Sequence, residues 1–226
     1  MNLRRLLPPR VKAFGRALIS TLRRDSVASA RRKARAYLGN PACLHLGCGQ
    51  QVIDGWLNVD VYPSDRRVVA FDVRTGLHFL DDASIDFIYN EHFFEHFDLR
   101  GGRKLLAECR RVLRPGGRMR ISMPDLDRVV RRYLAGWADG AGEFRDYRRA
   151  FFGEPLLDTP GELLNLSLRG YEHRFLYAEP DIVRMLEQSG FRNVRRVAHG
   201  VSEAAAFVGL ETRSAEKEPL IVEAEK

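Results

Sequence analysis

The sequence predicts an α/β fold, built around a mostly parallel sheet whose faces are covered by helices. Two observations predict this fold. Short apolar runs that are typical of strands alternate with segments whose apolar residues recur at helical spacing. The first of these runs ends in a glycine-rich turn, and the next runs end in acidic or amide side chains. Strands that alternate with helices favour parallel pairing, because each parallel connection has to cross over the sheet.

Seven segments are predicted as strands: 42–46, 56–61, 67–71, 84–90, 118–124, 193–198 and 220–225. Asp98 can cap a helix that continues to Pro115, and a later helix is predicted from Glu179 or Pro180 to Gln188. Residues 125–178 are rich in arginine, glycine and aromatic side chains and contain no clear strand. We interpret them as a helical insertion between strands five and six. The tail after Glu223 is expected to fray.

The composition is that of a soluble globular protein. The chain has 226 residues, of which 45% are hydrophobic and 30% charged. No apolar run approaches the ~18 residues of a membrane span, and no secretion signal is recognisable at the start. The three cysteines lack the spacing of a disulfide framework or a zinc knuckle. We therefore expect buried thiols in a cytoplasmic protein.

Positive charge is concentrated in residues 1–40, which we interpret as a basic helical arm preceding the main domain, 41–226. The arm carries 11 Lys and Arg against one acid, whereas the whole chain has a net charge of +7. Residues 26–38 are predicted to form a helix that packs on the domain. For residues 3–24, basic side chains and an apolar stripe favour peripheral contact with an anionic membrane. Nucleic acid is a weaker prediction, because stacking aromatic residues and a known reading motif are missing.

Residues that follow the predicted strands are candidates for ligand binding, because parallel sheets bind ligands at the carboxyl ends of their strands. Gly47 and Gly49 allow close backbone approach, and free N–H groups there can hold a carboxylate or phosphate. Asp60 can accept hydrogen bonds from both hydroxyls of a ribose, or begin a turn. Asp72 can meet an adenine amino group or cap a turn. Asn90 ends the fourth strand.

Taken in order, several segments carry a resemblance to a known family: "LHLGCG", "GWLNVDV", "FDV", "LDDASIDFIYNEHFFEHF", "LLAECRRVLRPGGRMRISMPD" and "HRF…LEQSGF". Over residues 41–197, the chain resembles class I S-adenosylmethionine-dependent methyltransferases. It is most similar to small bacterial ones associated with polysaccharide or lipopolysaccharide assembly. The resemblance implies a Rossmann-like, seven-stranded sheet, S-adenosylmethionine as cofactor, and methyl transfer to a small molecule or glycan. A hydroxyl of a cell-surface polysaccharide or its precursor is the expected acceptor.

The resemblance also assigns cofactor-binding residues. It places the two glycines against the methionine moiety, Asp60 at the ribose, Asp72 near the adenine, and Asn90 in the pocket wall. The complete predicted set is His45, Gly47, Cys48, Gly49, Asp60, Val61, Asp72, Val73, Asn90 and Glu91. Two features depart from the usual pattern. Val52 replaces a third small residue, and only 50–55 separate the glycines from the second strand, too few for a full crossover helix.

The segment His92-Phe-Phe-Glu95-His96 matches the inverted zinc-protease signature. A zinc site would need a helix long enough for both histidines and a third ligand such as Glu172. The glycine pair 101–102 soon interrupts the helical run, and by resemblance this segment is common in the family without zinc. We therefore predict no metal.

The sulfonium methyl group of the cofactor is already activated, so the protein has to align an acceptor and exclude water. A base is needed only for a hydroxyl acceptor, and His92, Glu95 and His173 are the candidates for catalysis. The insertion 125–178 would form the acceptor side, with Tyr171, His173 and Arg174 as substrate-binding residues. A cofactor-binding module without activity is the main alternative. An NAD-dependent reductase or a zinc hydrolase explains fewer of the motifs.

Overall fold

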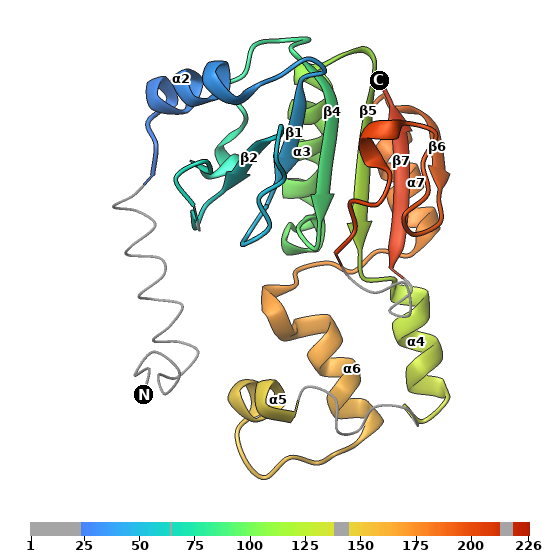
Figure 1. Ribbon diagram of the computed structural model, residues 1–226. Helices are drawn as coiled ribbons and strands as arrows, with labels where there is room; N and C mark the ends of the chain where they lie inside the picture. Colours follow the sequence, from blue (N-terminus) through green and yellow to red (C-terminus); the bar gives the residue numbers. More distant parts are fainter. Residues whose placement is uncertain (1–23, 64, 138–144, 213–218) are drawn as a thin grey trace.

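The computed structural model describes residues 24–63, 65–137, 145–212 and 219–226. These residues form one seven-stranded sheet in the order β3-β2-β1-β4-β5-β7-β6 (Figure 1). The strands are β1 Cys43–Leu46, β2 Leu57–Asp60, β3 Val69–Ala70, β4 Ile85–Glu91, β5 Leu113–Met123, β6 Arg192–Arg196 and β7 Leu220–Glu225. The first five strands are parallel, and β7 is antiparallel to both of its neighbours. The predicted mostly parallel sheet is confirmed.

Helices cover one face of the sheet and extend beyond its carboxyl edge. They are α2 Val27–Tyr37, α3 Leu99–Val112, α4 Leu126–Leu134, α5 Arg145–Phe152, α6 Pro160–Arg169 and α7 Glu179–Gln188. Short 3-10 turns are η2 Val73–Thr75, η3 Phe94–His96, η4 Gly170–Glu172 and η5 Ala205–Phe207. Helices α4, α5 and α6 lie below the carboxyl ends of β4 and β5 (Figure 1), so the predicted insertion borders the expected ligand edge. Within the described ranges, no helix is long and apolar enough to cross a bilayer.

The two faces of the sheet are covered differently. On one face, α3 and α7 bury their apolar sides in the main core, where Leu106 and Leu186 are fully buried. On the other face, the described residues form loops and the short turn η5. Trp56 from a loop and Phe207 from η5 pack beside Tyr89 of β4. Residues 47–56, between β1 and β2, contain no helix, as their length predicted.

Helix α2 lies at the β3 edge of the sheet. Ser26 caps it by accepting the Ser29 N–H, and Ala30 and Ala34 are buried. The preceding Asp25 extends the sheet edge: its N–H donates to the Ala70 carbonyl, and its carboxylate accepts the Ala70 N–H. This edge pairing fixes the start of the helix. The apolar stripe predicted between residues 11 and 22 lies outside the described residues.

Two expectations about strand ends were wrong. The C-terminal tail does not fray, because β7 continues to Glu225 and Lys226 is held on both sides. Its Nζ donates to the Leu113 carbonyl at 2.6 Å, and its N–H donates to the Gly117 carbonyl at 3.0 Å. Strand β5 also begins earlier than predicted, at Leu113, so it includes the Pro115–Gly117 segment. The long-range partner of this segment is the chain end, which local sequence does not reveal.

Candidate functional site

The glycine turn after β1 lies against an aromatic ring. Gly47 and Gly49 have positive φ values of 68° and 53°. A Cβ on Gly47 would lie 2.1 Å from the Phe93 ring, whereas a Cβ on Gly49 would meet nothing within 4 Å. Any side chain at Gly47 would therefore collide with Phe93, and the open part of the turn is at Gly49.

The backbone N–H groups of this turn are already used, which corrects the expectation of free donors. The N–H groups of Gly47 and Cys48 donate to the Val59 carbonyl at 2.9 and 3.2 Å. The Gly49 N–H donates to Asp60 Oδ2 at 2.8 Å. The turn offers space to a ligand, but these three donors hold the turn against β2.

Asp60, at the end of β2, is oriented by two backbone donors. Its Oδ2 accepts from Gly49 and its Oδ1 accepts from the Tyr62 N–H at 2.7 Å. Burial raises the pKa of Asp60 above its usual value, and these hydrogen bonds oppose the rise. Since a carboxylate can accept about four hydrogen bonds, Asp60 keeps acceptor capacity for a hydroxyl of an added diol. The predicted neighbour Val61 is half-buried beside it.

Asp72 caps a turn, which was one of its two predicted roles. It accepts the Arg74 N–H at the start of η2 and forms ion pairs with Arg74 at 2.7 Å and Arg24 at 3.4 Å. The Arg74 guanidinium holds the pKa of Asp72 below its usual range. The adjacent predicted residue, Val73, is buried. The Asp72 carboxylate is thus largely occupied by its ion pairs with the two arginines.

Asn90, in β4, has a buried amide without a partner. Its exposed fraction is 0%, and neither Nδ2 nor Oδ1 finds a hydrogen-bond partner among the described residues. A buried polar group left unpaired costs about 1–3 kcal/mol, so such groups generally have a ligand or a water to bond. Asn90 is therefore the clearest indication that a polar ligand belongs beside the end of β4.

The three remaining predicted cofactor residues, His45, Cys48 and Glu91, are buried and contact other parts of the protein. His45 Nδ1 donates to Asn58 Oδ1 at 3.0 Å, and burial lowers the pKa of His45 to about 4. Cys48 is buried, which raises its pKa to about 12. Glu91 accepts the Thr212 hydroxyl at 2.6 Å and so ties β4 to the loop before residue 213. The cofactor contacts of these three residues stay predictions.

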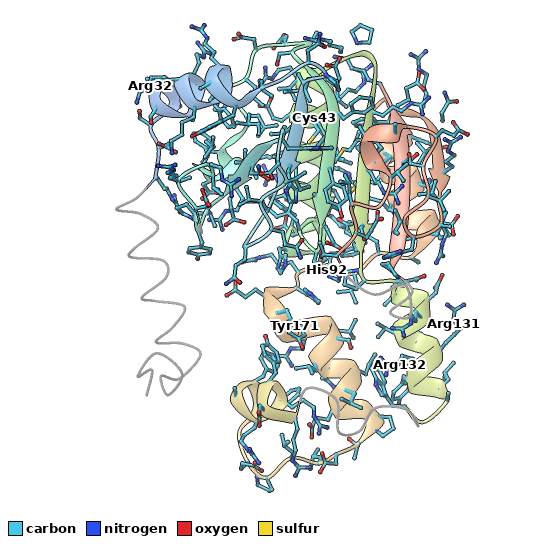
Figure 2. The ribbon with its side chains drawn as sticks, in the orientation of Figure 1. Arg32, Cys43, His92, Arg131, Arg132 and Tyr171 are labelled. Atoms are coloured by element: carbon cyan, nitrogen blue, oxygen red, sulfur yellow. The ribbon has the colours of Figure 1, made fainter. Side chains whose placement is uncertain are left out.

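A polar cluster follows β4, where the chain turns sharply. His92 has a positive φ of 50°, and Glu95 in the next turn, η3, is fully buried. Glu95 Oε1 lies 3.2 Å from His92 Nδ1 and 3.9 Å from His173 Nε2. Figure 2 places His92 at the carboxyl edge of the sheet, directly above Tyr171 of the insertion. The three predicted catalytic residues are therefore brought together.

Backbone pairing holds His173 against the turn η3. The N–H groups of Arg174 and Phe175 both donate to the Glu95 carbonyl, at 2.9 and 3.2 Å. His173 Nδ1 lies 2.8 Å from the Ser167 carbonyl, and burial lowers its pKa. The His96 ring is 5.4 Å from the His173 ring.

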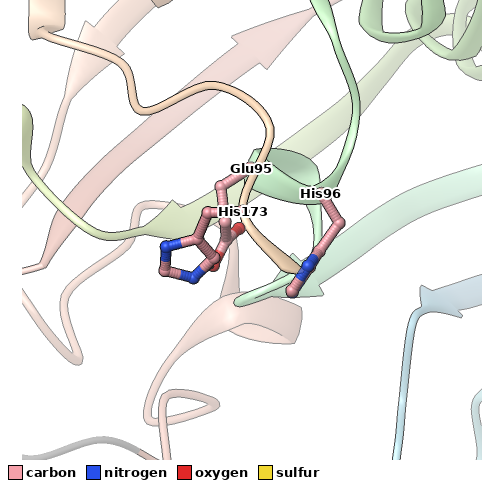
Figure 3. Close-up of side chains that lie close together, drawn as sticks. All are labelled: Glu95, His96 and His173. Carbon is pink, nitrogen blue, oxygen red and sulfur yellow. The ribbon is translucent and has the colours of Figure 1, made fainter. Parts of the chain in front are cut away.

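Sequence reasoning did not foresee that His96 would complete this cluster. The ligand atoms of Glu95, His96 and His173 all lie within 4.8 Å of one another (Figure 3). The turn η3 has only three residues, so the two histidines of the H-x-x-E-H pattern do not share a helix. Glu172, the third ligand that the zinc pattern would need, is exposed and outside the group. The H-x-x-E-H pattern indicated part of this group, because Glu95 and His96 belong to both.

The region expected to bind the methyl acceptor contains a pair of stacked aromatic rings and a cavity lined in part by cationic side chains. The Tyr171 ring stacks on Tyr147 at 4.1 Å, and its N–H donates to the Tyr147 hydroxyl oxygen. A cavity of about 790 Å³ borders the cluster and is lined in part by His78, His96, Arg100, Lys104 and Arg174. Its volume lies in the usual range for small-molecule sites. The predicted substrate residue Arg174 is exposed in it.

A buried charge network supports the loop-covered face, and no sequence pattern indicated it. The Arg120 side chain of β5 is fully buried and donates to Glu211 and Glu223, both at 2.5 Å. It also donates to the Val201 carbonyl at 2.9 Å. The Glu211 side chain in turn accepts the Gly200 N–H. Arg120 thus anchors the segment 198–212, whose end carries the Thr212 partner of Glu91.

Comparisons with known proteins agree with this architecture. A family model described as a methyltransferase domain matches residues 59–121, which run from the end of β2 into β5. A crystal structure of an S-adenosylmethionine-dependent methyltransferase from Archaeoglobus fulgidus is 16% identical, with a TM-score of 0.50. That alignment covers 92% of this chain and 98% of the other. The sheet order, with its antiparallel β7, is that of the class I methyltransferase fold.

A second structure, a possible histamine N-methyltransferase from Thermotoga maritima, is also 16% identical, with a TM-score of 0.46. The alignment covers 96% of each chain. Similarity at this level concerns the fold. No curated protein matches the sequence significantly.

Proposed function

We propose that this chain, an S-adenosylmethionine-dependent methyltransferase with the class I fold, methylates a hydroxyl group of a glycan or small molecule. The supporting observation is the pair formed by His92 and Glu95 at the end of β4. Their side chains approach to 3.2 Å, and they differ sharply in exposure, 30% for His92 against 1% for Glu95. His173 is exposed by only 8%. Of the three candidates, His92 is the one that an acceptor can reach.

The proposed step moves one proton and one methyl group. His92 takes the proton of the acceptor hydroxyl, and the oxygen forms a bond to the methyl carbon. The carbon–sulfur bond breaks, and its electron pair stays on sulfur. Glu95 acts as a positioning residue, because its contact with Nδ1 leaves the other ring nitrogen of His92 for the acceptor. S-adenosylmethionine supplies the activated methyl group, so no other reactant is required.

The cofactor would lie along the carboxyl edge of β1, β2 and β4. Three features support this placement: the open space at Gly49, the remaining acceptor positions of Asp60, and the unpaired amide of Asn90. Together they match a ligand with a diol and with polar groups beside β4. Phe93 fills the space beside Gly47, so the methionine moiety would contact Gly49 more than Gly47.

Replacing Asp60 with asparagine should weaken binding of S-adenosylhomocysteine about 10- to 100-fold. A hydrogen bond to a charged group contributes about 1.5–3 kcal/mol, and the substitution removes the charge while it keeps the shape. Isothermal titration calorimetry measures the affinity. Asp65→Asn, on the same loop, loses the same charge and should bind as the parent protein does. Equal affinities for all three proteins would remove Asp60 from the cofactor site.

A polysaccharide or a precursor of one is the acceptor that we propose. The cations around the 790 Å³ cavity and the exposed Tyr171 ring support a polar acceptor with sugar rings or acidic groups. The experiment is transfer of labelled methyl groups to a panel of cell-surface glycans and their precursors. We expect a base-stable methyl ether in the product. Labelled methyl groups found only on amines would contradict the proposal. So would a protein that binds S-adenosylmethionine but transfers its methyl group to none of the acceptor classes.

We also propose that the protein works in the cytoplasm, at the inner face of the membrane. The basis is the charge of +10 in residues 1–40 and the apolar stripe between residues 11 and 22. Residues 3–24, which would make this contact, lie outside the described ranges except for Arg24. The proposal therefore depends on sequence alone.

A further inference from the structure

We propose that Glu95, His96 and His173 bind one divalent transition-metal cation, of the kind that zinc represents. The site lies between the turn η3 and the segment that follows η4 (Figure 3). It is a binding site of its own, and its test does not depend on the acceptor proposed above. Three features support the site: the hydrogen bonds of His173, the burial of Glu95 and the short distances among the three side chains.

The hydrogen bonds of His173 determine which of its nitrogens is available. Nδ1 lies 2.8 Å from the carbonyl oxygen of Ser167, which can only accept, so Nδ1 must carry a proton. In the neutral ring, Nε2 then presents a lone pair. A histidine that binds a metal through Nε2 commonly donates its other N–H to a backbone carbonyl, which fixes ring orientation. His173 is held in this arrangement.

The lone pair of His173 faces a carboxylate. Nε2 lies 3.9 Å from Glu95 Oε1, beyond hydrogen-bond distance, so two acceptors face each other and no described residue is recorded as donating to Nε2. The second oxygen, Oε2, is buried and has no hydrogen-bond partner among the described residues. A buried carboxylate is costly unless a positive charge or a set of donors compensates it. A cation between Glu95 and His173 would satisfy both groups.

His96 supplies the third ligand. The described residues make no hydrogen bond to its ring nitrogens, and its ring lies 5.4 Å from that of His173. Two histidines and one carboxylate form a donor set that zinc uses in catalytic sites, where a fourth position stays open. Tetrahedral coordination separates ligand atoms by about 3.4 Å. The observed separations, up to 4.8 Å, require the side chains to close by up to about 1.4 Å.

This site differs from the one that the H-x-x-E-H pattern suggests. The pattern would use His92 and His96, whereas the proposed site uses His173 in place of His92, from a segment 81 residues further along. His92 Nδ1 lies 3.2 Å from Oε1 of Glu95, so His92 contacts the same carboxylate that the proposed cation would contact. A hydroxyl group that occupied the open position of such a cation would lose its proton more easily. The sequence predicted a protein without a metal. The site proposed here is the alternative to that prediction.

The test uses untagged, full-length protein that has been treated with a chelator and dialysed. Titration with ZnCl₂ in a calorimeter should show one site per chain. Titration with CoCl₂ should produce the visible absorption bands of tetrahedral cobalt. Glu95→Gln and His173→Ala should each weaken zinc binding at least about tenfold and remove the cobalt bands. Their folding is checked by circular dichroism.

His92→Ala is the matched control, because it removes a neighbouring histidine that is not a proposed ligand. It should bind zinc as the parent protein does. Loss of binding in His92→Ala with retention in His173→Ala would assign the metal to the H-x-x-E-H pattern and overturn our assignment. Absence of a site in the parent protein would overturn it as well. Methyl transfer is measured separately, with the glycan panel, so failure of the metal site and failure of the methyl-transfer proposal are distinguishable.

Discussion

His92→Ala should lower kcat for methyl transfer about 100- to 10,000-fold, the range over which a positioned general base contributes. The affinity for S-adenosylhomocysteine should change little, because the proposed cofactor contacts are at Gly49, Asp60 and Asn90. His92 is the most exposed of the three catalytic candidates, at 30% against 1% for Glu95 and 8% for His173, and it directly follows β4. Single-turnover kinetics with a glycan identified from the panel measures the chemical step without product release.

Glu95→Gln separates a positioning role from a structural one. Glutamine keeps the shape of the side chain but loses its charge, so a protein that folds normally should still show a reduced kcat. His199→Ala, which removes a half-buried histidine between β6 and η5, should keep full activity. If His92→Ala retains kcat within a few-fold of the parent value, the acceptor needs no base. The proposal that His92 acts as the base in methylation of a hydroxyl would then be wrong.

Arg120→Met should destabilise the protein by about 3–5 kcal/mol, the usual cost of removing one partner of a buried ion pair. The substitution leaves Glu211 and Glu223 facing each other in the interior, where their side chains are exposed by 0% and 4%. It also releases the Val201 carbonyl, so the segment 198–212 loses its anchor on the sheet. Urea denaturation at neutral pH measures the free energy of unfolding.

Arg118→Met provides the comparison on the same strand. Arg118 is 32% exposed and forms only long ion pairs, at 3.8 and 3.9 Å, so its loss should cost less than about 1 kcal/mol. Replacing Arg120, Glu211 and Glu223 together with apolar residues of similar size should recover most of the lost stability. Similar losses for the two single variants would show that the buried network is not what holds this loop.

Sequence by itself determined the sheet and the edge where ligands are expected. Apolar runs such as "CLHL" and "IDFIY" alternate with amphipathic helices, and this periodicity depends only on local spacing. Parallel pairing then brings the carboxyl ends of the strands to one edge, so Gly49, Asp60 and Asn90 could be chosen in advance. The helix cap at Asp98 was equally visible, because capping involves residues three positions apart.

Only the tertiary structure decided which side chains act together. Hydrogen bonds from Arg174 and Phe175 to the Glu95 carbonyl bring His173 to the turn η3, and no local pattern encodes that pairing. The same holds for the C-terminal Lys226 against β5 and for Arg120 with its two glutamates. Burial and the choice of partner are properties of contacts between distant segments. The sequence therefore indicated which residues lie at the edge. Packing selected the partners of Glu95 and, among the residues that the structure describes, gave the Asn90 amide none.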